Sequence, residues 1–93
     1  MSKYNFDILI ENSNGDKKVG DPISEMIAEV LEGFSGYEEG DKSAMWSLIG
    51  EIRRKGEVEL NENEVEMLKK YWKNVDTRLD IDMTVRSILD MEE

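Results

Sequence analysis

The stretch ELNENEVEML, residues 59–68, joins the end of an alternating pattern to the beginning of a helical one. Asn61 is followed three residues later by Glu64, which is the spacing of a capping box, where each side chain accepts a hydrogen bond from the other residue's backbone N–H. Leu60 and Val65 flank this pair and can pack together as a hydrophobic staple. The stretch therefore predicts that a helix begins after Asn61, and its glutamates need no catalytic interpretation.

This helix should continue to about residue 74, because apolar side chains recur at spacings of three and four. Its inward-facing positions are Val65, Leu68, Trp72 and Val75. Farther along the chain, Asp82 has the position of an N-cap for a last helix, with Ile81 packing just ahead of it. The inward-facing positions of that helix are Val85, Ile88 and Leu89.

Two further helices are predicted upstream of the stretch. The first follows Asp21 and Pro22, a capping carboxylate and a proline at the first helical position, where the missing N–H costs no hydrogen bond. The second covers residues 43–55 and ends at Gly56. Each carries one apolar stripe. The stripes consist of Ile23, Met26, Ile27, Val30, Leu31 and Phe34, and of Met45, Leu48, Ile49 and Ile52.

The N-terminal segment predicts a strand that turns back as a hairpin. Apolar side chains occupy every second position, the period of a half-buried strand. These positions are Tyr4, Phe6, Ile8 and Ile10. Asn14 and Gly15 then give the strongest short signal for a type I′ turn. In such a hairpin Glu11 faces Lys18, and Ile10 faces Val19.

Length and composition favour one folded domain. The 93 residues are 39% hydrophobic and 37% charged, and since the apolar residues are periodic, the chain should bury a modest core. We predict a single compact α+β domain over residues 1–93. In it an N-terminal β-hairpin, with a third short strand near residues 57–60, packs against about four short helices.

The charge balance restricts the partners. Acidic residues outnumber basic ones by 22 to 12, which gives a formal net charge of -10. Such a chain repels nucleic acid and anionic membranes, so we expect neither as a partner, and it favours a protein with a basic surface. No apolar run approaches the roughly 20 residues of a membrane span, and the start MSKYNFDILIEN lacks the apolar segment of a signal peptide. We therefore expect a cytoplasmic protein.

Most site chemistry is excluded by residue type. The chain has no histidine and no cysteine, which rules out Ser-His-Asp and Cys-His arrangements, thiolate redox chemistry and zinc sites with nitrogen or sulfur ligands. A calcium loop beginning at Asp80 fails because Val85 replaces the required glycine and Met91 the bidentate glutamate. Asp76, Asp80 and Asp82 are better interpreted as a solvated loop. We expect no cofactor, no metal and no enzymatic activity.

Charge pattern gives the first candidate binding surface. Glu25, Glu29 and Glu32 lie opposite the apolar stripe of their predicted helix. The loop that follows adds three more carboxylates, those of Glu38, Glu39 and Asp41. Together the six could imitate nucleic-acid phosphates for a basic partner. The alternative is an acidic face that serves only solubility.

Aromatic placement adds two candidate anchors. Trp72 lies on a buried stripe and is expected in the core. Trp46 is offset by one position from the inward Met45, and Tyr37 lies in a glycine-rich loop beside the acidic residues. Either could contact a partner, since tryptophan and tyrosine dominate interface hot spots. The alternative is that Trp46 covers the edge of the core.

The segments YNFDILIENSNGDKKV and GEVELNENEVEMLKKYWKN resemble the small, uncharacterised acidic accessory proteins that bacteriophages and mobile elements encode. The resemblance implies a host-directed binder or inhibitor acting in the host cytoplasm, and it supplies no residue assignments. The leading hypothesis is a non-enzymatic protein-binding modulator. The alternatives are an assembly protein that self-associates through apolar surface, for example as a homodimer, and a carboxylate-dependent enzyme.

Overall fold

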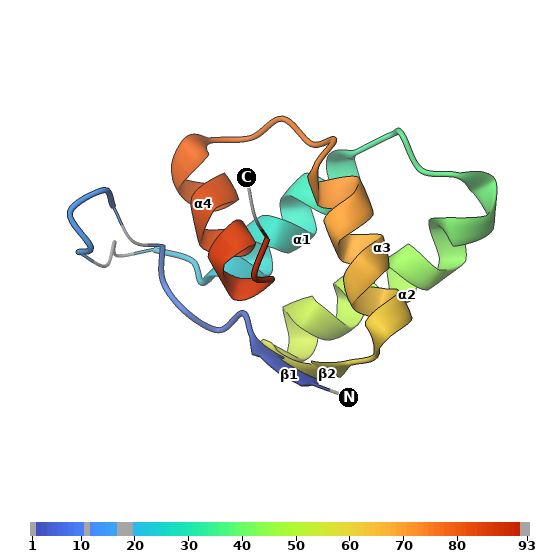
Figure 1. Ribbon diagram of the computed structural model, residues 1–93, viewed down its shortest axis with the longest axis horizontal. Coiled ribbons are helices and arrows are strands. Elements are labelled where there is room, and N and C mark those ends of the chain that lie inside the picture. Colours follow the sequence, from blue (N-terminus) through green and yellow to red (C-terminus); the bar gives the residue numbers. More distant parts are fainter. Residues whose placement is uncertain (1, 11, 17–19, 92–93) are drawn as a thin grey trace.

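The computed structural model describes residues 2–10, 12–16 and 20–91. Within them the chain forms an α+β fold of two strands, four α-helices and one short 3-10 helix, and this confirms the predicted class (Figure 1). In chain order the elements are β1 (Ser2–Asn5), α1 (Ile23–Gly33), η1 (Glu39–Asp41), α2 (Lys42–Lys55), β2 (Glu57–Leu60), α3 (Glu62–Trp72) and α4 (Leu79–Ile88).

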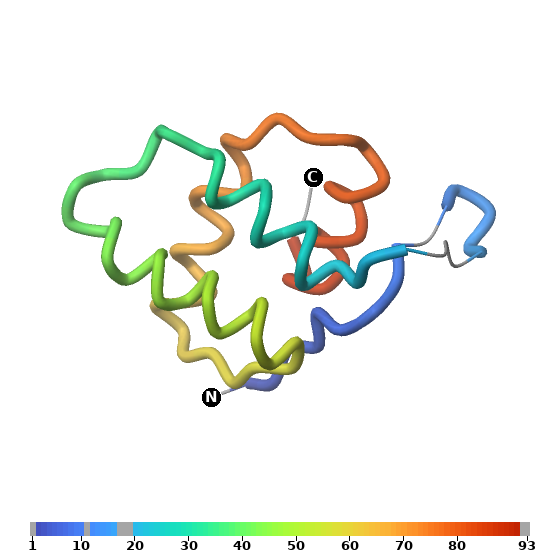
Figure 2. Tube along the Cα trace, turned by 180° about the vertical axis from the view of Figure 1, so that it is seen from behind, coloured from blue at the N-terminus to red at the C-terminus, as the bar shows by residue number. Residues whose placement is uncertain are grey.

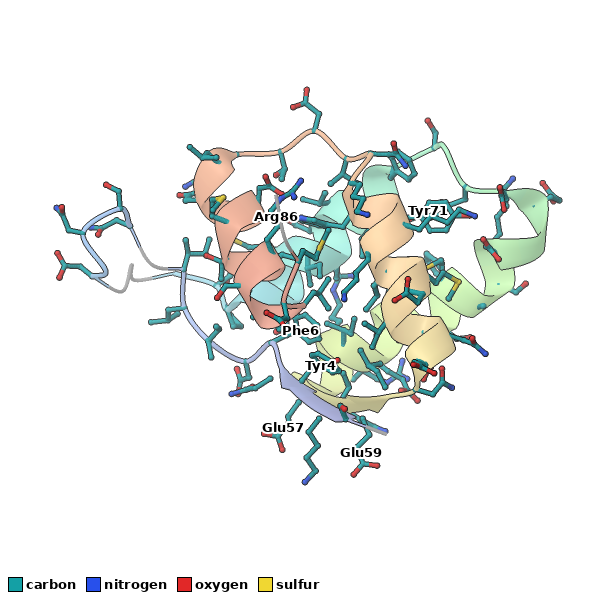
Figure 3. All side chains as sticks on the ribbon, viewed as in Figure 1. Tyr4, Phe6, Glu57, Glu59, Tyr71 and Arg86 are labelled. Carbon is teal, nitrogen blue, oxygen red and sulfur yellow. The ribbon has the colours of Figure 1, made fainter. Side chains whose placement is uncertain are left out.

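The strand predicted near residues 57–60 is present and pairs with the N-terminal strand. β1 and β2 run antiparallel, with Ser2 opposite Leu60 and Asn5 opposite Glu57. Side chains alternate across the sheet, so Val58 and Leu60 are buried while their neighbours are exposed. Figure 3 shows the exposed Glu57 and Glu59 pointing away from the helices. The sheet therefore joins two segments that lie more than 50 residues apart in the sequence.

The N-terminal strand is shorter than predicted, and the reason is the helix that follows it. β1 ends at Asn5, although the Phe6 N–H still donates to the Gly56 carbonyl at 2.8 Å. The carbonyls of Phe6 and Ile8 instead accept from the first N–H groups of α1, those of Ser24 (2.8 Å) and Ile23 (2.7 Å). These helix donors have no partner inside the helix, so the extended segment caps it.

The cap predicted at Asp21 was therefore wrong. Pro22 holds the N-cap position of α1, and no side chain caps the helix. A turn is present in the predicted hairpin region, but it is not the predicted type I′ turn, which needs a positive φ at both Asn14 and Gly15. Only Gly15 has one, of 89°, and its N–H donates to the Asn12 carbonyl at 2.9 Å, so the turn runs from Asn12 to Gly15. The predicted second strand, including the pairs Glu11–Lys18 and Ile10–Val19, lies outside the described residues.

The capping box at Asn61 is confirmed. Asn61 Oδ1 accepts from the Glu64 N–H at 2.8 Å, and Glu64 Oε1 accepts from the Asn61 N–H at 2.9 Å. Leu60 and Val65, the predicted staple, are both buried. The local pattern of residues 59–68 thus fixes where β2 ends and where α3 begins.

The last helix begins earlier than predicted, because α4 has Arg78 and not Asp82 at its N-cap. Asp82 lies one turn inside the helix. Its Oδ1 accepts from the indole Nε1–H of Trp72 at 2.8 Å and from Nε of Arg86 at 2.9 Å. Trp72 is buried, as predicted. The carboxylate expected to cap α4 therefore links α4 to α3.

The core forms around α1, which packs against both α2 and α4. Figure 2 shows α1 crossing between these two helices, on the side of the molecule opposite α3. Its innermost side chains are Ile23, Ile27, Ala28 and Leu31, while Met26, Val30 and Phe34 are partly buried.

Within the described ranges, no helix has the length and apolar character needed to cross a membrane.

Candidate functional site

The three carboxylates predicted to face water on α1 differ in their surroundings. Arg53 of α2 contacts two of them, with Nη1 2.6 Å from Glu32 Oε1 and Nε 3.2 Å from Glu25 Oε2. Glu29 is exposed and makes no ion pair with any described residue. A helical wheel of α1 gives the direction of these side chains but cannot show a cation on another helix. One positive charge thus offsets part of this acidic group.

The carboxylates of the following loop are tied to α3. Lys70 Nζ lies 2.9 Å from Glu38 Oε2 and 3.6 Å from Asp41 Oδ2. The Tyr71 hydroxyl donates to Asp41 at 2.5 Å and accepts from the Glu38 N–H at 3.2 Å. Figure 3 shows Tyr71 directed from α3 toward this segment. Glu39 is exposed and pairs with Lys42 at 2.9 Å.

These contacts change the titration of two α3 side chains. The hydrogen bond to the Asp41 carboxylate, together with burial, raises the pKa of Tyr71. The hydrogen bond to Glu38 raises the pKa of the Lys70 ammonium. Both groups keep their protons at neutral pH, so Tyr71 and Lys70 hold the loop to α3 as hydrogen-bond donors.

Tyr37 belongs to an internal aromatic cluster. Its ring packs against those of Phe34 and Tyr71, with centroid distances of 5.0 Å and 4.7 Å. Its hydroxyl donates to the Leu31 carbonyl at 2.6 Å, and burial raises its pKa to about 12. The polar end of Tyr37 is therefore already used within the fold, and only its partly exposed ring remains for a partner.

Trp46 is the most conspicuous apolar side chain on the surface of α2. It is 69% exposed, whereas Met45 and Ile49 on the adjoining face are buried. Of the two alternatives for Trp46, an exposed side chain or one that covers the edge of the core, the structure shows the exposed one. Trp46 borders a groove of about 340 Å³ between α2 and the end of α1. The other apolar side chains that line this groove are Leu31, Phe34, Tyr37, Met45 and Ile49.

A second depression lies on the other side of Trp46, toward the end of α2. Gly50, one turn after Trp46, is part of its lining together with Arg53 and Arg54. A Cβ atom at position 50 would lie 3.0 Å from Nη1 of Arg54. The missing side chain at Gly50 thus lets the Arg54 guanidinium lie close to the helix backbone in the depression that Trp46 also lines.

Another groove was missed by the sequence reasoning. It measures about 460 Å³ and lies between β1 and α3, with Tyr4 and Val65 among its lining residues. Glu62 and Glu66 also line it, and neither forms an ion pair with a described residue. On the sequence alone, these glutamates are interpreted only as residues that start a helix. Their spacing of four places them on the same side of α3, and this is the signal that could have indicated a shared surface.

Across the described ranges, no group of three or more carboxylates is arranged to hold a metal ion. Comparisons with protein-family models, with curated proteins and with solved structures return no match. The candidate functional site therefore rests on surface geometry: the exposed Trp46 and its mainly apolar groove, whose charged lining residues are Glu32 and Lys42.

Proposed function

We propose that this chain is a non-enzymatic protein-binding modulator and that it engages its partner through the Trp46 face. This face comprises Trp46 and the groove lined by Leu31, Phe34, Tyr37, Met45 and Ile49. The observation that carries the proposal is the 69% exposure of an indole beside an apolar groove. Tryptophan is the side chain most enriched among interface hot spots, and burying it gains a large apolar area.

The partner should present a basic surface. The chain carries a formal net charge of -10, and Glu29 is exposed without an ion pair to a described residue. The other five carboxylates of the predicted acidic surface already contact cations within the chain, so they contribute less to the outward field; they are Glu25, Glu32, Glu38, Glu39 and Asp41. Exposed charges mainly accelerate encounter, whereas a central apolar anchor mainly slows dissociation. We assign the first role to the acidic side chains and the second to Trp46.

The resemblance to accessory proteins of bacteriophages and mobile elements supports a host protein as this partner, met in the host cytoplasm. A second candidate function is self-association, in which Trp46 of one copy enters the groove of another. The position of the indole next to a groove favours it, while mutual repulsion between chains of the same net charge opposes it. Sedimentation at low and high salt separates the two, since self-association should strengthen as salt screens the repulsion.

The proposal can be tested by affinity capture from a bacterial lysate, with the immobilised wild-type chain beside the variants Trp46→Ala and Leu79→Ala. Leu79 is a matched control because it is 73% exposed and lies on α4, outside the Trp46 face. A protein retained by wild type and by Leu79→Ala but lost with Trp46→Ala would support the proposal. Equal retention by all three would contradict it.

A further inference from the structure

The outer edge of β1 carries backbone groups that point away from β2. In an antiparallel pair, alternate residues direct their N–H and C=O groups toward the neighbouring strand and the others direct them away. The Phe6 N–H donates to the Gly56 carbonyl, so Phe6 faces β2, and Lys3 and Asn5 face outward. Among the described residues, no backbone hydrogen bond engages these outward groups.

This edge is accessible. Figure 1 shows β1 on the near side of the two-stranded sheet, with β2 and α2 behind it and α3 above. Three of the four residues of β1 are exposed, and the fourth, Tyr4, is partly buried. A free edge of this kind is a template for another strand.

The groove between β1 and α3 adjoins the same edge. Tyr4 and Ser2 lie on the side of the sheet that faces α3, since they stand opposite the buried Val58 and Leu60. A strand added beside β1 would lie about 4.7–4.9 Å away and would direct every second side chain toward this groove. Val65 is the apolar part of the α3 wall.

The acidic side chains at this groove favour an added strand that carries basic side chains. Glu62 and Glu66 occupy the α3 wall without an ion pair to any described residue, and Lys69 is the one cation among the described residues that line the groove. We propose that the edge of β1 binds an extended peptide segment of a partner protein, whose alternate side chains are basic and reach Glu62 and Glu66. Backbone hydrogen bonds would supply affinity, and the groove would supply selectivity.

This site goes beyond the proposed function, because it shares no lining residue with the groove at Trp46. Either site can fail without affecting the evidence for the other. A partner using both would gain from their linkage, since the second contact becomes intramolecular.

The probe is a six-residue peptide of alternating lysine and valine, acetylated and amidated, titrated into the isotope-labelled full-length chain and followed by amide NMR. We expect shifts over residues 2–5 and 61–69, and slower hydrogen exchange at the Lys3 and Asn5 amides. The same peptide with glutamate in place of lysine should bind at least about tenfold more weakly. Unchanged exchange at Lys3 and Asn5, or shifts confined to the Trp46 face, would overturn the proposal.

Two variants locate the binding energy. Lys3→Pro removes one outward N–H and leaves the β2-facing groups of Tyr4 in place, while Lys3→Ala removes the same side chain and keeps the donor. The proline variant should bind the lysine peptide about tenfold more weakly than the alanine variant, through the lost hydrogen bond and the bulk of the ring. Equal affinities would refute strand addition.

Because proline could also disturb β1, the double variant Glu62→Gln, Glu66→Gln provides a test that leaves the sheet intact. It preserves side-chain size and removes the two charges. Affinity for the lysine peptide should fall and become less dependent on salt. An unchanged affinity and salt dependence would exclude these carboxylates as the basis of selectivity.

Discussion

The indole Nε1–H of Trp72 donates to Oδ1 of Asp82 at 2.8 Å and so joins the end of α3 to the first turn of α4. Trp72 is fully buried, and Asp82 is the one acceptor that the described residues offer to its indole N–H. The same carboxylate accepts from Arg86 at 2.9 Å. A buried donor that loses its acceptor costs the free energy of its desolvation, so this contact should matter for stability.

Replacing Asp82 tests that relationship. Asp82→Ala should lower the free energy of unfolding by about 1 to 3 kcal/mol, as measured by denaturant titration. Asp82→Asn keeps an acceptor oxygen for the indole and should lose less. The control is Asp76→Ala, which alters an exposed carboxylate and should change stability by less than about 0.5 kcal/mol. If Asp82→Ala behaves like Asp76→Ala, the link between the helices contributes nothing.

The capping box gives a second stability prediction. Asn61→Ala removes the side-chain acceptor for the Glu64 N–H and should destabilise the chain by about 0.5 to 2 kcal/mol. Asn63→Ala is the matched control, because Asn63 is exposed within the same first turn and caps nothing. Equal melting temperatures of the two variants would show that the start of α3 does not depend on the cap.

The capping box and the helices near it were predicted from sequence because their signals are local. Asn61 and Glu64 are three residues apart, and Gly56 ends α2 next to its last turn. The errors have a different physical origin. The acceptors at the start of α1 are carbonyls of Phe6 and Ile8, well removed along the chain, and Asp82 is used by Trp72. Only the assembled fold brings these groups together.

The candidate binding residues also divide into those that the local sequence pattern predicts and those that depend on packing between helices. The outward direction of Glu29 follows from the apolar stripe of α1 and could be predicted. The pairing of Glu25 and Glu32 with Arg53 could not, because it depends on how α1 packs against α2. For Trp46 the helical period left two alternatives, since a residue at the edge of a stripe is buried or exposed according to what the next element covers.

Tyr37 predicts a pH dependence. Its pKa is raised from 10.0 to about 12, mainly by burial, so the folded chain binds this proton more tightly than the unfolded chain. The corresponding stability is fully present below pH 10 and is lost as the pH rises through about 12. Denaturant titrations across this range should show the loss.

Tyr37→Phe should make that pH-dependent loss shallower, and absorbance of tyrosinate should lose one late-titrating group. Tyr4→Phe is the control, because Tyr4 makes no hydrogen bond to a described side chain or loop. A titration curve for Tyr37→Phe that retains every late-titrating group would mean that another tyrosine accounts for them.

Gly50 separates stability from binding. Gly50→Ala should stabilise α2 by about 0.5 to 1 kcal/mol, because alanine loses less backbone entropy in a helix and the Arg54 guanidinium can move from the new methyl group. The same methyl group narrows the depression beside Trp46 and should weaken partner binding. Thermal melts and binding titrations of one preparation report both effects.

Gly33→Ala is the control for that variant, since a Cβ there meets no atom within 4 Å. It should leave partner binding unchanged. A Gly50→Ala chain that binds its partner as well as wild type would show that the depression beside Trp46 is not part of the contact.

The central claim is that Trp46 anchors a protein partner, and the most direct measurement is the dissociation constant of the captured partner for wild type, Trp46→Ala and Leu79→Ala. Loss of a hot-spot tryptophan costs about 2 kcal/mol or more, so Trp46→Ala should raise Kd by roughly 30-fold, chiefly through faster dissociation. Leu79→Ala, which removes an equally exposed apolar side chain from α4, should change Kd by less than about threefold. Equal Kd values for Trp46→Ala and wild type would contradict the claim.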